Sequence, residues 1–128
     1  MIDFHNHILP GADDGAKTMK ESIKMLHFAK EQGITDVVNT IHFQHPKMEG
    51  MNTNFDYVCS LRDKLLETME KENISINIHL GAEVFFNFNL LDIVDNPLTT
   101  FGTGKYMLVE FQTFMLPKDF DKHLYELA

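Results

Sequence analysis

Stretches of strand-type sequence alternate with stretches of helical periodicity along this chain of 128 residues, and that alternation limits the possible folds more than any other feature. Strand-type runs occur at the start of the chain and over 35–41, 74–84 and 106–111, and helical patterns include 55–73 and 89–95. Strands joined in sequence through helices pair in parallel with right-handed crossovers. The chain is therefore expected to be an α/β protein built from parallel β/α units.

The helix expected after the opening strand carries residues typical of its two ends. Thr18, with Glu21 three residues later, forms a capping box at the start of a helix predicted over 18–32. Gly33 is the expected left-handed residue after its last turn. Near the other end of the chain, Asp119 is the expected N-cap of a last helix.

Side chains that can bind a metal lie at the carboxyl end of every expected strand. His5 and His7, two residues apart in an extended segment, point to the same side and can put two imidazole nitrogens on one ion. The other strands end in His42, Glu83 and Glu110. Because parallel strands bring their carboxyl ends to one edge, where sites form in α/β proteins, these side chains are expected to gather. Imidazole and carboxylate ligands suit zinc, manganese or iron.

Three further polar residues lie close to these strand ends in the sequence. Asp13 and Asp14 follow a Pro/Gly turn, where they either add oxygen ligands or form an ordinary Asp-Gly turn without a metal. Asp14 is the better candidate of the two for a ligand. His45 is interpreted as a surface or substrate-facing residue rather than a ligand.

The charge balance excludes several kinds of partner. A formal net charge of −8 offers no basic surface for nucleic acid or for an anionic membrane. No stretch approaches the roughly 18 apolar residues of a membrane span, and the N-terminus has an acid and two histidines where a signal peptide would be apolar. We therefore expect a cytoplasmic protein without a membrane span.

The single cysteine, Cys59, does not fit a cysteine-dependent tyrosine phosphatase. Such enzymes need a thiolate followed six positions later by an arginine, in a loop whose backbone amides hold phosphate. Arg62 follows only three positions later and lies inside a helical pattern. Cys59 is therefore interpreted as a bystander.

Four motifs resemble those of the polymerase and histidinol phosphatase (PHP) family, and within it the capsule-associated bacterial tyrosine-protein phosphatases (CpsB-like). They are HNHILPGADDG over 5–15, VNTIH over 38–42, GAEV over 81–84 and LVEF over 108–111. The similarity covers all 128 residues, and the motifs occur in the family's order. Ile41 is a small departure, because the family usually has proline before the histidine of the second motif.

The resemblance also implies a fold and its extent. Members of the family form a distorted seven-stranded, TIM-like barrel, and they continue beyond these motifs with a further histidine near an arginine and a late Asp-x-His pair. Residues 1–128 are therefore expected to be the N-terminal part of a single PHP domain, about half of the barrel, with the C-terminal half absent. Half a barrel exposes strand edges, so we expect self-association.

The same resemblance implies up to three divalent metals, most often manganese, that assist the hydrolysis of phosphate monoesters such as phosphotyrosine. By position, the ligands would be His5 and His7 on one metal, Glu83 and Glu110 on a second that Glu83 shares with the first, and Asp14 with His42 on a third. The metals would supply positive charge for the phosphate and activate water, which a domain of this net charge needs.

A phosphotyrosine protein is the implied substrate, a tyrosine kinase of polysaccharide export being one candidate, and capsule regulation is the implied role. Two alternatives stay open. One is an inactive truncated remnant that binds a metal or a partner without turnover. The other is a different PHP phosphoesterase, such as a histidinol-phosphatase-like enzyme.

Overall fold

A computed structural model describes residues 1–48, 53–102 and 104–128 of the chain. Within these residues four strands form one parallel sheet in the order β1-β2-β3-β4. The strands are β1 (Ile2–Asn6), β2 (Asp36–Phe43), β3 (Asn77–Phe85) and β4 (Leu108–Glu110). The parallel α/β class expected from the sequence is thus confirmed.

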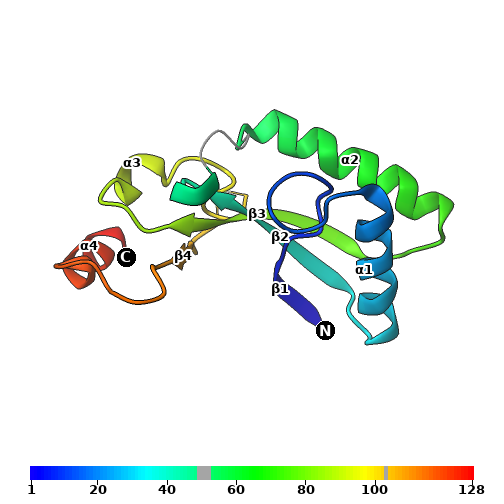
Figure 1. The fold of residues 1–128 in the computed structure, drawn as a ribbon, viewed down its shortest axis with the longest axis horizontal. Helices are drawn as coiled ribbons and strands as arrows, with labels where there is room; N and C mark the ends of the chain where they lie inside the picture. The colour runs from blue at the N-terminus through cyan, green and yellow to red at the C-terminus, as the bar shows by residue number, and fades with distance from the viewer. Residues whose placement is uncertain (49–52, 103) are drawn as a thin grey trace.

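Helices follow each strand along the chain. They are α1 (Met19–Glu31), η1 (Pro46–Met48), α2 (Phe55–Lys71), α3 (Leu90–Ile93) and α4 (Phe120–Leu127). Figure 1 shows α1 and α2 side by side along the sheet, while α3 and α4 lie toward the other end of the molecule near β4. None of the helices in the described ranges has the length and apolar character needed to cross a membrane.

The core lies where α1 and α2 pack on the sheet. The side of α2 that faces the sheet is apolar at helical spacing, and its buried residues are Val58, Leu61, Leu65 and Met69. Leu65 is fully buried, whereas its neighbour Leu66 on the outer side is 40% exposed. Burying a side chain of this size contributes about 1.5–3 kcal/mol, so this face of α2 fixes the helix on the sheet.

The ends of α1 follow the expectation closely. The Thr18 hydroxyl accepts a hydrogen bond from the Glu21 backbone N–H at 3.2 Å. The Glu21 carboxylate accepts from the Lys17 N–H at 2.7 Å, one residue before the partner that a standard capping box uses. Gly33 has a φ of 78°, the left-handed conformation that ends the helix region.

One carboxylate, that of Asp36, accepts several side-chain hydrogen bonds at the opposite, amino end of the sheet. Asp36 accepts hydrogen bonds from the His79 ring at 3.0 Å, the Thr35 hydroxyl at 2.7 Å and the Asn77 amide at 3.0 Å. These bonds, with His79 the largest contribution, lower the pKa of Asp36 to about 2. The first residues of β2 and β3 are thereby joined through their side chains.

The third strand ends close to the expected 74–84 but begins later, at Asn77, because pairing with β2 decides where it starts. Its first residue pairs with Asp36, the first residue of β2, and the ladder continues to Val84 opposite Phe43. Ile74 and Ile76 lie before the strand and are 6% exposed each. Their alternation reflects burial in the core rather than strand pairing.

Three expectations near the C-terminus are met only in part. Asp119 is the N-cap residue of α4, as expected, but its φ is 61° and its side chain makes no capping bond. Its carboxylate instead accepts from the Lys122 ammonium at 2.8 Å. The elements α3 and β4 are shorter than the expected 89–95 and 106–111. Short elements of this kind depend on neighbours more than on local sequence.

Candidate metal centre

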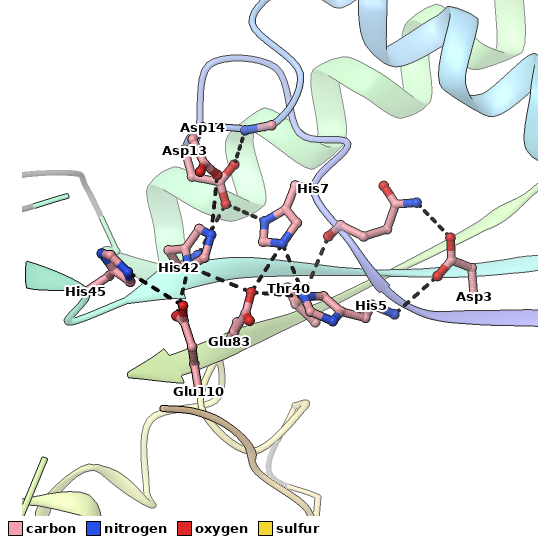
Figure 2. Close-up of polar contacts among 12 residues, drawn as sticks. Asp3, His5, His7, Asp13, Asp14, Thr40, His42, His45, Glu83 and Glu110 are labelled. Carbon is pink, nitrogen blue, oxygen red and sulfur yellow. Dashed lines mark hydrogen bonds and ion pairs between the residues drawn. The ribbon is translucent and has the colours of Figure 1, made fainter. Parts of the chain in front are cut away.

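The carboxyl ends of the strands bring the expected polar residues together. His42 lies directly opposite Glu83 in the pairing of β2 with β3, and Glu110 lies opposite Phe85 in the pairing of β3 with β4. Figure 2 shows the side chains of His42, Glu83 and Glu110 pointing toward one another, with His5 and His7 beside them. The expected gathering at one edge of the sheet is therefore present.

An irregularity in β1 helps to direct His5 in the strand and His7 just after it. Between Asp3 and Asn6, β1 contains one more residue than the facing part of β2. An extra residue of this kind bends a strand and re-aims its side chains. The Nε2 atoms of His5 and His7 lie 3.3 Å apart, so the two rings do point to one place.

The first group of candidate ligands is His5, His7 and Glu83. The Glu83 Oε2 atom lies 2.9 Å from His5 Nε2 and 3.3 Å from His7 Nε2. Two ligands that share one ion at about 2.0–2.2 Å each lie about 3.0–3.5 Å apart, so these three atoms are spaced as one ion requires. Two ring nitrogens and a carboxylate oxygen also form a suitable donor set.

The second group is His42, Glu83 and Glu110. His42 Nδ1 lies 3.3 Å from Glu110 Oε2 and 3.7 Å from Glu83 Oε2. His42 Nδ1 and Glu110 Oε2 are buried and make no hydrogen bond to any described residue. Since buried polar atoms are nearly always satisfied, a cation that accepts both lone pairs fits this position.

The third group contains His7, Asp13, Asp14 and His42. His42 Nε2 lies 3.3 Å from Asp14 Oδ1, on the side of the ring away from Glu110. The Asp14 side chain is 63% exposed, whereas that of Asp13 is 2% exposed. A neutral imidazole has one lone pair, so His42 can serve either this group or the second one, but not both at once.

A tight loop places the two aspartates over His7. The Ala16 N–H donates to the His7 carbonyl at 3.0 Å, and the Gly11 N–H donates to the Ala16 carbonyl at 2.8 Å. A Cβ atom on Gly15 would lie 2.3 Å from the His7 carbonyl oxygen. Only glycine therefore allows the loop to approach His7 this closely.

Asp13 and His7 are hydrogen-bonded to each other, and the pKa of each is shifted from its usual value. The hydrogen bond between His7 Nδ1 and Asp13 Oδ2, at 2.8 Å, raises the pKa of His7 against the opposing effect of burial. Burial would raise the pKa of Asp13, but hydrogen bonds from His7, Gly15 and His42 outweigh it and hold that pKa below its usual value. Asp13 is thus ionised in a nearly dry position.

His45 lies nearer the site than a surface residue would. Gln44, with a φ of 50°, turns the chain after β2, and its amide donates to the Phe85 carbonyl at 2.8 Å. His45 Nε2 then lies 3.5 Å from Glu110 Oε1, and its side chain is 13% exposed. Its Nδ1 accepts from the Lys47 backbone N–H at 3.1 Å. The neutral ring therefore carries its proton on Nε2, directed at the site.

The structure places Cys59 within α2, on the helix that the sequence indicated. The Arg62 guanidinium pairs with the neighbouring Asp63 carboxylate at 3.1 Å. Neither residue belongs to the three candidate groups in the described part of the chain.

Comparison with known proteins agrees with this geometry. The model of the family described as "Capsular polysaccharide synthesis, CpsB/CapC" matches residues 1–128. The tyrosine-protein phosphatase YwqE of Bacillus subtilis is 32% identical over 129 residues, covering 99% of this chain and 49% of YwqE. The tyrosine-protein phosphatase CpsB of Streptococcus pneumoniae is 29% identical over 117 residues, covering 87% of this chain and 45% of CpsB.

A solved structure is similar over nearly the whole chain. It is one of the crystal structures of YwqE from Bacillus subtilis and CpsB from Streptococcus pneumoniae, which are described as unique metal-dependent tyrosine phosphatases. The TM-score is 0.89 at 29% identity, and the match covers 99% of this chain and 51% of the solved one. The chain thus spans about half the length of the relatives it matches, and its four β-α units correspond to half of their barrel.

Proposed function

The chain belongs to the CpsB/CapC family of capsular polysaccharide synthesis, and on that premise we propose that it provides metal ligands for a protein-tyrosine phosphatase of the PHP class. One observation carries the proposal. Glu83 Oε2 lies within 3.7 Å of nitrogens from three histidines: His5 in β1, His7 just after β1, and His42 in β2. The lone pairs of His5 and His7 can bind one cation beside this carboxylate and Glu110 can bind a second, so Glu83 is suited to bridging two cations.

The proposed ligands are those expected from the sequence, and the distances between them support the assignment. They are His5 and His7 on one ion, Glu83 and Glu110 on a second that Glu83 shares, and Asp14 with His42 on a third. Manganese is the proposed metal, because the donor set mixes imidazole with several carboxylates. When bound, such ions supply positive charge to phosphoryl oxygens and lower the pKa of attacking water.

The chain's own residues contribute position and proton placement. The strands hold the donor atoms at fixed spacing, so little rearrangement is needed when a substrate binds. His45 keeps its Nε2 proton directed at the site because Nδ1 accepts from the Lys47 N–H. We propose that His45 faces the substrate and donates to a phosphoryl oxygen, which is one of the two roles, surface or substrate-facing, expected from the sequence.

The biological setting is proposed from the family. The relatives named above are tyrosine-protein phosphatases, so a phosphotyrosine protein is the proposed substrate, with a tyrosine kinase of polysaccharide export as a candidate. Residues 1–128 would form the N-terminal part of the phosphatase domain, in line with their coverage of about half of each relative. A cytoplasmic location stays a prediction from the sequence.

Self-association of the 128-residue chain is proposed from its edge strands. In the described residues β1 pairs only with β2, and its Ile2 and Phe4 side chains are 62% and 54% exposed. An exposed apolar edge favours pairing with another copy. Size-exclusion chromatography with light scattering checks this, and a monomer at high concentration would contradict it.

The phosphatase proposal is tested with the protein as its gene encodes it. Hydrolysis of a phosphotyrosine peptide is measured after exhaustive chelation and again after adding manganese. We expect activity only with the metal. A panel that includes histidinol phosphate separates this function from another PHP phosphoesterase. Metal binding without turnover on any substrate would favour the inactive-remnant alternative.

A further inference from the structure

We propose that Asp13 is a positioning residue rather than a metal ligand, and that it selects the tautomer of His7 which leaves Nε2 free for the metal. The proposal rests on the metal centre proposed above. It assigns different roles to two adjacent acids that the sequence pattern alone does not separate. Asp14 would face the metal, and Asp13 would face inward to hold the residues that bind it.

The contacts of Asp13 come from three separate points of the chain. Its Oδ2 atom accepts from His7 Nδ1 at 2.8 Å and from the His42 backbone N–H at 3.2 Å. Its Oδ1 atom accepts from the Gly15 backbone N–H at 3.0 Å. The side chain is 2% exposed. One buried carboxylate therefore joins the end of β1, the following loop and the end of β2 (Figure 2).

The two backbone contacts decide the tautomer of His7. Each oxygen of Asp13 accepts from a backbone N–H, which favours the ionised carboxylate, and an ionised carboxylate has no proton to give. The nitrogen of His7 that faces it must carry the hydrogen. In a neutral ring the lone pair is then on Nε2, which lies 3.3 Å from both His5 Nε2 and Glu83 Oε2.

The same contacts weigh against Asp13 as a ligand. An ion bound to Asp13 Oδ2 would displace the His7 Nδ1 proton or the His42 N–H from a well-formed hydrogen bond. Asp14 has no such restriction, because its side chain is 63% exposed and one oxygen lies 3.3 Å from His42 Nε2. Carboxylates that orient a ligating histidine in this way commonly affect metal affinity by about 10–100-fold.

Asp13 also links two of the candidate ligand groups. It contacts the ring of His7, which belongs with His5 and Glu83, and the backbone of His42, which belongs with Asp14. Loss of Asp13 should therefore weaken metal binding in both places. Loss of a residue that held only one ligand would weaken metal binding in one ligand group and leave the other unchanged.

The test begins with the metal-free, ¹⁵N-labelled chain at about pH 8.5, about two units above the ordinary histidine pKa of about 6.5, because the pKa of His7 is raised. Long-range ¹H–¹⁵N spectra report which ring nitrogen of His7 carries hydrogen. We expect hydrogen on Nδ1 in the wild-type chain and loss of this preference in Asp13→Ala. Asp3→Ala is the matched control, because Asp3 also accepts from a backbone N–H, that of His5 at 3.2 Å, but contacts no ring nitrogen of a described residue.

Zinc, which is diamagnetic, is then added to the same samples. We expect the Nε2 signal of His7 to shift while the Nδ1 hydrogen remains, and calorimetry to give about 10–100-fold weaker zinc binding for Asp13→Ala than for Asp3→Ala. Loss of the Nδ1 hydrogen on loading would place zinc on Nδ1, and a loss of affinity as large as that of His7→Ala would indicate that Asp13 is a ligand. Either result would overturn the proposal.

The experiment also gives a clear answer if a variant does not fold or if the chain binds no zinc. If Asp13→Ala does not fold, the wild-type spectra with and without zinc still decide, since hydrogen on Nε2 in the metal-free chain contradicts the proposal. If the wild-type chain binds no zinc, the proposed metal centre fails. The tautomer of His7 in the metal-free chain then still tests the effect of Asp13 on its own.

Discussion

Replacing Glu83 by glutamine should impair metal binding more than any other single change at the strand ends. Glu83 Oε2 lies 2.9 Å from His5 Nε2, 3.3 Å from His7 Nε2 and 3.7 Å from His42 Nδ1, so it takes part in two of the candidate groups. Glutamine keeps the shape but removes the negative charge, and its neutral oxygen is a poor bridge between two cations. Both ions should therefore bind more weakly.

The expected effect on catalysis follows from the charge that the ions supply in the transition state. Losing one such stabilising contact commonly costs about 10²-fold or more in turnover, which is about 2.7 kcal/mol. The assays are calorimetry with manganese on the 128-residue chain and phosphotyrosine hydrolysis on the protein as its gene encodes it. Glu126→Gln is the matched control, because Glu126 also lies near a histidine, at 3.9 Å from His123 Nδ1, but in α4. Unchanged manganese stoichiometry and turnover in Glu83→Gln would refute the bridging role.

Three other predictions concern the mechanism, the core and the amino end of the sheet. His42→Ala should lower turnover by about 10²-fold or more, whereas Cys59→Ser should leave it nearly unchanged; steady-state kinetics showing the reverse order would point to a cysteine mechanism. Leu65→Ala should lower the free energy of unfolding by about 2–5 kcal/mol, and Leu66→Ala should cost much less because that side chain is 40% exposed; urea titrations that show equal losses would contradict the packing of α2. The folded pKa of Asp36, about 2, lies below its usual value, so the stability it contributes is present above about pH 4 and is lost as the pH falls toward 2. Thermal melts of Asp36→Asn should lack that part of the acid dependence.

Local sequence was sufficient for the parts of the fold that depend on neighbours along the chain. The cap at Thr18 and the left-handed Gly33 lie where their patterns indicated, because both act within one turn of helix. The apolar face of α2 follows the 3.6-residue period directly. The parallel sheet could be predicted because connections through helices leave few other arrangements.

Features that depend on another strand could not be read from the sequence. The bounds of β3 are set by its register with β2, and the run that begins at Ile74 alternates whether or not it is paired. The extra residue in β1 between Asp3 and Asn6 has no local signal, although it helps to direct His5 toward the site. The left-handed conformation of Asp119 likewise went unpredicted, because an aspartate before a helix usually acts as its cap.

The candidate site, like the fold, could be predicted from the sequence only in part. Its position could be predicted, because parallel strands bring their carboxyl ends to one edge whatever their exact bounds. The separate roles of Asp13 and Asp14 could not, since an Asp-Asp-Gly run fits a turn and a ligand equally well. Only the loop's close approach to His7, which Gly15 permits, turns one acid inward and leaves the other exposed.

The most direct test of the metal centre is anomalous diffraction from crystals of the manganese-loaded protein, recorded at the manganese absorption edge. The account predicts a peak about 2.0–2.3 Å from His5 Nε2, His7 Nε2 and Glu83 Oε2, the three atoms that lie 2.9–3.3 Å from one another. Further peaks are expected beside Glu110 if the second ion binds and beside Asp14 if the third ion binds. A loaded crystal with no anomalous peak among His5, His7 and Glu83, or with manganese only at distant carboxylates such as Asp36, would contradict it.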